Sequence, residues 1–176
     1  EGSRTKQNDS YLRRGFLDHF QETTPTVEDY VEGFTAAHSA ANEPYSVQSV
    51  SDDRLALLCR GILIPNAKGA GMTPVTLNKF YRFRARSLEV RYDLLSEDDL
   101  DAWFAIEINL SVSAGSTARA VGPRGAQRIL RQAVSFGPST LVEIDDPGSG
   151  ARLTIRTGDA QSGICLLYTT PSPRDR

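Results

Sequence analysis

The chain has 176 residues, of which 39% are hydrophobic and 24% are charged, and its formal net charge at pH 7 is −2. This composition is typical of a folded globular protein and unlike that of a disordered chain. The nearly even charge does not favour a nucleic acid as partner, and no stretch approaches the ~20 apolar residues of a membrane-spanning helix. The length predicts one domain.

The N-terminal segment, residues 1–43, is predicted to contain one short helix. Within residues 24–33, Thr24 can cap the helix, Pro25 suits its first position, and Gly33 ends it after about two turns. Residues 10–20 mix aromatic and charged side chains without a clean period.

From Pro44 onward the hydrophobic period changes to two, which indicates β-strands. We expect strands at residues 45–51, 54–60, 76–85, 87–95 and 101–114. The run LIPNAKGAGMTP, residues 63–74, is typical of a surface loop. In residues 76–85 the alternation places one lysine, Lys79, on the same face as Leu77, Tyr81 and Phe83.

The second half of the chain continues this pattern. Residues 139–146 and 151–157 flank DPGSG, a strong turn signal, and predict a hairpin. Residues 124–134 fit a short helix or a strand, and the sequence does not decide between them. Long antiparallel strands with almost no helix predict an all-β protein, a large antiparallel β-sandwich over residues 44–164.

The last twelve residues, Cys165–Arg176, read CLLYTTPSPRDR and closely resemble the translated read-through of a sequencing adapter. We expect residues 165–176 to be an artefact outside the fold. Without them Cys59 is the only cysteine, which excludes an intrachain disulfide and a cysteine-based zinc site. Cys59 follows the apolar run LALL and is predicted to be buried.

One face of the strand predicted at residues 101–114 is a candidate binding site. Trp103, Glu107 and Asn109 alternate with the apolar residues Phe104 and Ile106. The flat ring of a tryptophan can cover a sugar, and a neighbouring carboxylate and amide can bind its hydroxyl groups. The alternative is a structural ion pair between Glu107 and an arginine of a neighbouring strand, with Arg82, Arg84 and Arg91 as candidates.

The adjacent residues Asp18 and His19 form the second candidate pair. A neutral histidine beside a carboxylate can act as a general acid or base. The alternative is a structural role, in which both side chains bind backbone groups and hold the N-terminal segment in place. With two histidines and one cysteine outside the tail, we expect no transition-metal site and no cofactor.

Four segments in order resemble one known family. They are YLRRGFLDHF (11–20), NKFYRF (78–83), LEVRYDLLSEDDLDAWFAIEINLSVSAG (88–115) and VEIDDPGSGARLTI (142–155). Together they resemble the C-terminal domain of glycoside hydrolase family 57 alpha-amylases and 4-alpha-glucanotransferases. Two departures are Gly15, where the family often has serine, and a shorter loop after Ser111.

The resemblance implies a galactose-mutarotase-like supersandwich, incomplete here, and a partner, the N-terminal catalytic barrel of the same polypeptide, which holds the catalytic acidic pair. We therefore expect a truncated, non-catalytic accessory domain that binds alpha-glucan or packs against the barrel, and a cytoplasmic location with export left open. Two alternatives stay open. One is an aldose-epimerase-like enzyme that uses His19 and Glu107, and the other is a purely structural sandwich.

Overall fold

The computed structural model describes residues 16–23, 26, 38–40, 42–67, 71–108, 118–122, 125, 127–129, 134–158 and 163–166. The chain divides into two compact units. Unit 1 comprises Glu1–Gln7, Pro25–Phe34 and Leu110–Arg176, and unit 2 comprises Asn8–Thr24 and Thr35–Asn109. The strands of the described residues pair antiparallel throughout, as the sequence predicts.

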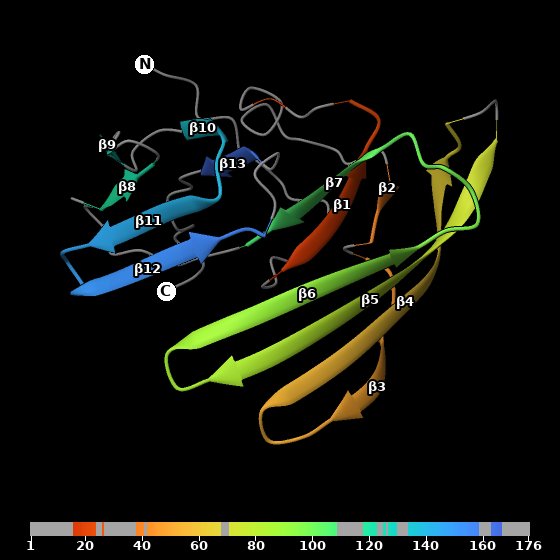
Figure 1. Ribbon diagram of the computed structural model, residues 1–176, viewed down its shortest axis with the longest axis horizontal. Helices are drawn as coiled ribbons and strands as arrows, with labels where there is room; N and C mark the ends of the chain where they lie inside the picture. The colour runs from red at the N-terminus through yellow and green to blue at the C-terminus, as the bar shows by residue number, and fades with distance from the viewer. Residues whose placement is uncertain are drawn as a thin grey trace, which may run out of the picture. The chain divides into compact units, whose positions relative to one another are not determined.

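A four-stranded sheet forms the larger part of unit 2 (Figure 1). Its order is β3-β4-β5-β6, with β3 at Ser46–Val50, β4 at Arg54–Pro65, β5 at Met72–Arg84 and β6 at Ser87–Leu95. The predicted strands at 45–51 and 87–95 are confirmed almost residue for residue. The predicted alternation of β5 is confirmed as well, because Val75, Leu77 and Lys79 are all buried on one face.

The predicted loop at residues 63–74 is too long, because its first three and last three residues belong to strands. β4 continues to Pro65 and β5 already begins at Met72. The register of the two strands shifts between Cys59 and Ile62, and Gly61 adopts a φ of 78° there. This β-bulge interrupts the alternation of side chains, so the sequence of one long strand resembled a strand followed by a loop. Beyond the bulge, Ile62 and Ile64 lie on the buried face again.

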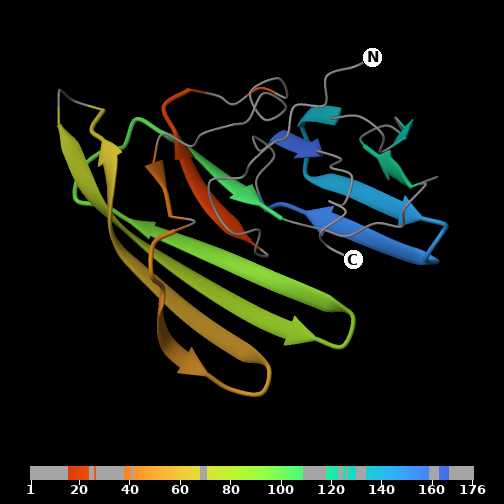
Figure 2. The ribbon, with the colours of Figure 1, turned by 180° about the vertical axis from the view of Figure 1, so that it is seen from behind.

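A second, three-stranded sheet completes unit 2. Its order is β2-β1-β7, with β1 at Leu17–Gln21, β2 at His38–Ser39 and β7 at Trp103–Glu107. Figures 1 and 2 show from opposite sides that this sheet lies against the β3–β6 sheet. The core between them contains Phe20, Ala40, Cys59, Ile62, Ile64, Val75 and Leu77. Unit 2 is therefore a sandwich, and Cys59 is buried as predicted.

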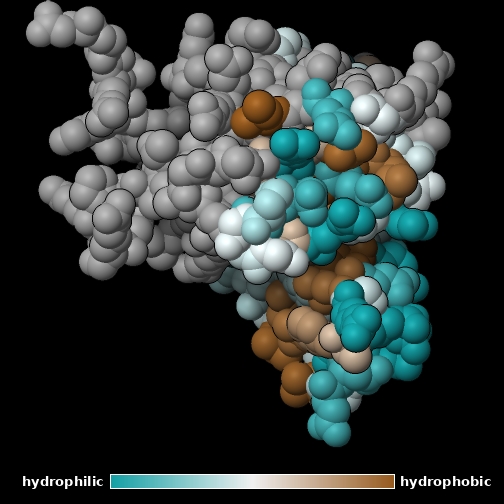
Figure 3. Space-filling view, turned by 90° about the vertical axis from the view of Figure 1, so that its left-hand side faces the viewer, coloured by the Kyte–Doolittle hydropathy of each residue, from teal (hydrophilic) through white to brown (hydrophobic). Residues whose placement is uncertain are grey.

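Part of the apolar face of the larger sheet stays in solvent. Near the turns at residues 51–53 and 85–86 the exposed side chains include Val47, Val50, Phe83 and Leu88. Figure 3 shows hydrophobic residues in brown beside hydrophilic ones in teal at this lower end of the molecule. The described part of the sandwich thus covers only one end of the sheet with a second layer.

Unit 1 contains the remaining strands. One sheet has the order β12-β11-β8-β9, with β8 at Arg119–Val121, β9 at Gln127–Ile129, β11 at Leu141–Asp146 and β12 at Ala151–Arg156. The predicted hairpin is confirmed by the β11–β12 pairing across residues 147–150. The stretch 124–134, open to helix or strand, is a strand at Gln127–Ile129.

Unit 1 also holds a two-stranded sheet of β10 (Val134–Pro138) and β13 (Gly163–Leu166). The short helix predicted at 24–33 lies outside the described residues, apart from Thr26, and so does most of the strand predicted beyond Ile108. None of the described residues forms a helix long and apolar enough to cross a membrane.

Candidate functional site

Strand β1 brings the two candidate regions together. Its five residues pair in unbroken register with β7, so that His19 lies opposite Ala105 and Asp18 opposite Ile106. Successive side chains of a strand point to opposite faces of the sheet. The side chains of Asp18 and His19 therefore lie on opposite faces of β1. They do not form the predicted pair.

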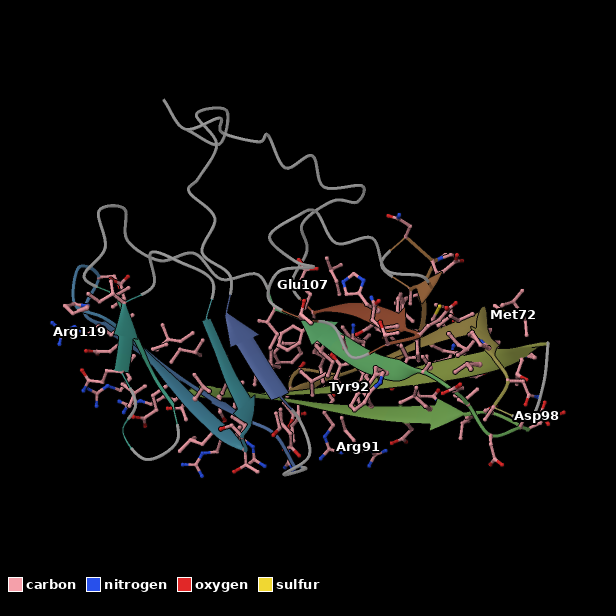
Figure 4. All side chains as sticks on the ribbon, turned by 90° about the horizontal axis from the view of Figure 1, so that it is seen from above. Met72, Arg91, Tyr92, Asp98, Glu107 and Arg119 are labelled. Carbon is pink, nitrogen blue, oxygen red and sulfur yellow. The ribbon has the colours of Figure 1, made fainter. Side chains whose placement is uncertain are left out.

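His19 binds Glu107 across the two strands. The His19 Nε2 atom lies 2.9 Å from the Glu107 Oε2 atom, with no exposed surface on the histidine and 26% exposure on the glutamate side chain. An ionised carboxylate only accepts hydrogen bonds, so the ring nitrogen donates. Figure 4 shows Glu107 on the side of β7 that faces away from the β3–β6 sheet. The partner that the structure shows for Glu107 is thus a histidine. The structural alternative had expected an arginine such as Arg82, Arg84 or Arg91.

Trp103 lies on the same face of β7 as Glu107, four residues away. Trp103 is 51% exposed, so its side chain is accessible to a ligand. The residue opposite Trp103 is Gln21, which is buried and whose Nε2 atom has no hydrogen-bond partner among the described residues. The third residue of the predicted platform, Asn109, lies outside the described residues.

On the other face of β1, Asp18 forms a buried ion pair with Lys79 of β5. The Lys79 Nζ atom lies 2.5 Å from Asp18 Oδ2 and 2.6 Å from the backbone oxygen of Phe16. The Tyr45 hydroxyl group donates a second hydrogen bond to Asp18 Oδ2, also at 2.5 Å. Asp18 Oδ1 is buried and has no partner among the described residues. The structural alternative expected backbone groups as partners of Asp18, whereas the partners in the structure are the side chains of Tyr45 and Lys79.

Three tyrosine rings surround the Lys79 ammonium group. Its Nζ atom lies 5.2 Å from the ring centre of Tyr45, 5.9 Å from that of Tyr81 and 5.4 Å from that of Tyr92. Burial, assisted by the Asp18 carboxylate, raises the pKa of Tyr81 to about 12 and raises the pKa values of Tyr45 and Tyr92 further. Figure 4 shows Tyr92 pointing from β6 into the space between the two sheets, while Arg91 points outward. All three hydroxyl groups therefore stay protonated at neutral pH.

A model of the family described as alpha-amylase/4-alpha-glucanotransferase, C-terminal, matches residues 2–172. The chain belongs to this family. Searches of curated proteins and of solved structures return no match. The resemblance of the four quoted segments is thus confirmed over nearly the whole chain.

As an alpha-amylase/4-alpha-glucanotransferase C-terminal domain, the chain is an accessory domain whose family implies a catalytic domain in the same polypeptide. Among the residues that the structure describes, no three His, Cys, Asp or Glu side chains are grouped so that they could hold a metal ion. In unit 2, Glu107 of β7 contacts His19 on one face of β1, and Lys79 of β5 contacts Asp18 on the other face.

Sequence reasoning missed Lys79 and Tyr45 as members of this arrangement. The signal for Lys79 was present, since a lysine within an apolar strand face has to be buried with a partner or to break the face. Tyr45 gave no such signal, because a tyrosine beside a strand is ordinary. Only the pairing of residues far apart in sequence shows that both contact Asp18.

Proposed function

We propose that this C-terminal domain is a non-catalytic accessory domain that binds an alpha-glucan chain along the exposed face of β7. The observation that carries the proposal is the half-exposed Trp103 on the same strand face as Glu107. The Glu107 carboxylate accepts a hydrogen bond from His19 of the neighbouring strand. The tryptophan ring offers an apolar surface to a sugar ring. The Glu107 side chain is 26% exposed, and a carboxylate can accept hydrogen bonds from sugar hydroxyl groups.

The spacing of the two side chains favours a chain of sugars over a single sugar. Trp103 and Glu107 are four positions apart on an extended strand, so their Cα atoms lie about 13 Å apart at ~3.3 Å per residue. The residue between them on this face is the small Ala105. This backbone separation is longer than one hexose ring, so we expect a glucan that lies along β7 to contact both the ring and the carboxylate.

The aldose-epimerase alternative gains one observation and meets one obstacle. His19 and Glu107 are in direct hydrogen-bond contact, so cooperation between them is geometrically allowed. However, His19 has no exposed surface, and the nitrogen that would meet a substrate already donates to Glu107. This arrangement supports His19 as a group that orients the carboxylate of Glu107, which suits binding better than proton transfer to a sugar.

Calorimetric titration of the 176-residue chain with maltoheptaose tests the proposal. Covering roughly 100 Å² of the Trp103 ring at about 25 cal/mol/Å² is worth ~2.5 kcal/mol, so Trp103→Ala should weaken binding by well over tenfold. Glu107→Gln should weaken it as well. The matched control is Phe83→Ala, which removes a similarly exposed aromatic ring, at 46%, from β5 and should leave affinity unchanged.

Two outcomes would count against this function. Binding that Phe83→Ala and Trp103→Ala weaken equally would mean that glucan contacts exposed rings without a defined site. Absence of maltoheptaose binding in the unsubstituted chain would favour the purely structural alternative, in which the domain only packs against its catalytic domain.

A further inference from the structure

We propose that Lys79 is a positioning residue of the glucan site, although it lies on the other sheet and on the opposite side of β1. Lys79 fixes β1 from β5, and β1 in turn holds His19 against Glu107. The predicted effect of Lys79 on glucan affinity rests on the proposed function. The predicted effect of Lys79 on the position of the His19 ring does not.

The first observation is the burial of Lys79. The residue is 3% exposed, and a lysine is almost never buried to this extent without a partner. Its ammonium group donates to Asp18 Oδ2 in β1 and to the backbone oxygen of Phe16, the residue just before β1. The Lys79 side chain of β5 therefore makes two hydrogen bonds at the N-terminal end of β1, one to a side chain and one to the backbone.

The second observation is the backbone at Phe16. This residue has a φ of 61°, in the left-handed region that residues other than glycine rarely occupy. Such a conformation persists only where surrounding contacts impose it. Here the contacts are the Lys79 hydrogen bond to the Phe16 oxygen and the edge-on packing of the Phe16 ring against Tyr81, with 5.9 Å between ring centres. Lys79 thus helps to set the direction in which the chain enters β1.

The third observation is the short path from Lys79 to the site. Asp18, which Lys79 holds, is covalently next to His19, and both belong to the stretch of β1 that pairs without a break with β7. A strand is rigid over two residues, so a shift or rotation at Asp18 moves the imidazole ring of His19. Because His19 binds Glu107 at 2.9 Å, a small rotation is enough to lengthen or break that hydrogen bond.

The test has to separate positioning from general loss of stability. Lys79→Met removes the ammonium group while keeping much of the length of the side chain. Leu77→Ala is the matched control, because Leu77 is fully buried on the same face of β5 two residues away and contacts the core without gripping β1. Both substitutions should lower the melting temperature of the 176-residue chain.

The readout is the nuclear magnetic resonance signal of the His19 ring, measured without glucan. The chain has two histidines, so His38→Gln assigns the signals. We expect Lys79→Met to abolish the protected Nε2–H signal of His19 and Leu77→Ala to retain it. With maltoheptaose, Lys79→Met should bind roughly tenfold more weakly, the loss of about one hydrogen bond to a charged group, while Leu77→Ala should bind normally.

A second variant covers the case in which Lys79→Met does not fold. The double variant Asp18→Asn with Lys79→Met leaves no uncompensated buried charge and should recover stability. It still lacks the hydrogen bonds from Lys79 to Asp18 and Phe16, so the Nε2–H signal of His19 should remain absent. A double variant with an unchanged His19 signal would overturn the proposal, as would equal loss of the signal in Leu77→Ala. Failure of the proposed function shows differently, as absent glucan binding in the unsubstituted chain with its His19 signal intact.

Discussion

Two tyrosines beside Lys79 should respond oppositely to the same substitution. Tyr45 and Tyr92 place their rings at nearly equal distances from the Lys79 Nζ atom, 5.2 and 5.4 Å. The Tyr45 hydroxyl group donates to Asp18 at 2.5 Å. The Tyr92 hydroxyl group is buried near the same carboxylate but makes no hydrogen bond of ordinary geometry among the described residues. Replacement by phenylalanine removes only the oxygen in both cases.

The expected magnitudes follow from this difference. Tyr45→Phe loses a hydrogen bond to a charged, buried acceptor and should cost about 1.5–3 kcal/mol of the free energy of unfolding. Tyr92→Phe removes a buried hydroxyl group that lacks a partner, so its effect should lie between zero and a gain of about 1 kcal/mol. The aromatic contacts with Lys79 remain in both variants, which makes each a control for the other.

Urea unfolding followed by tryptophan fluorescence measures both values. Trp103 is the only tryptophan of the chain and lies on β7 of unit 2, so its emission follows the unit that holds both tyrosines. The slope of the free energy against urea should be the same for the two variants. Equal destabilisation by Tyr45→Phe and Tyr92→Phe would refute the reasoning, since it would show that the Tyr92 hydroxyl group has a partner of similar strength.

Two further predictions concern pH and a turn. Tyr45, Tyr81 and Tyr92 have pKa values raised above 10.0, that of Tyr81 to about 12, so the unfolded chain loses these protons first as pH rises. The contribution of these three groups to stability should therefore be constant below about pH 10 and fall as the pH rises from about 10 to 12, which thermal melts over that range would show. A flat profile over that range would contradict the burial of these rings. Gly150 adopts a φ of 69°, so Gly150→Ala should destabilise unit 1 by about 1 kcal/mol, measurable by circular dichroism, and Gly150→Asn should cost less.

The sequence predicted the larger sheet better than the smaller one, for a physical reason. β5 and β6 have one buried and one more open face, so their alternation is visible. All five residues of β1 are buried, and a strand covered on both faces shows no alternation to read. The segment around Asp18 and His19 therefore appeared irregular, although its residues were rightly singled out.

The site was predictable in part. The shared face of Trp103 and Glu107 follows from the period of a strand, and the register of β7 confirms it. The contact between His19 and Glu107 joins residues 88 positions apart, and no local pattern contains that information. The division into segments 1–43, 44–164 and 165–176, and with it the role of the adapter-like tail, stays a prediction.

Strand β3 carries a consequence for how copies of this chain behave in a crowded solution. It lies at the edge of its sheet, and its exposed valines, Val47 and Val50, make it a template on which another extended segment can pair. The register between β3 and β4 shifts around Gln48, where two residues of β3 oppose one of β4. Such an irregularity turns the outer hydrogen-bonding groups of the strand out of line, and we expect it to disfavour edge-to-edge pairing between copies of the chain.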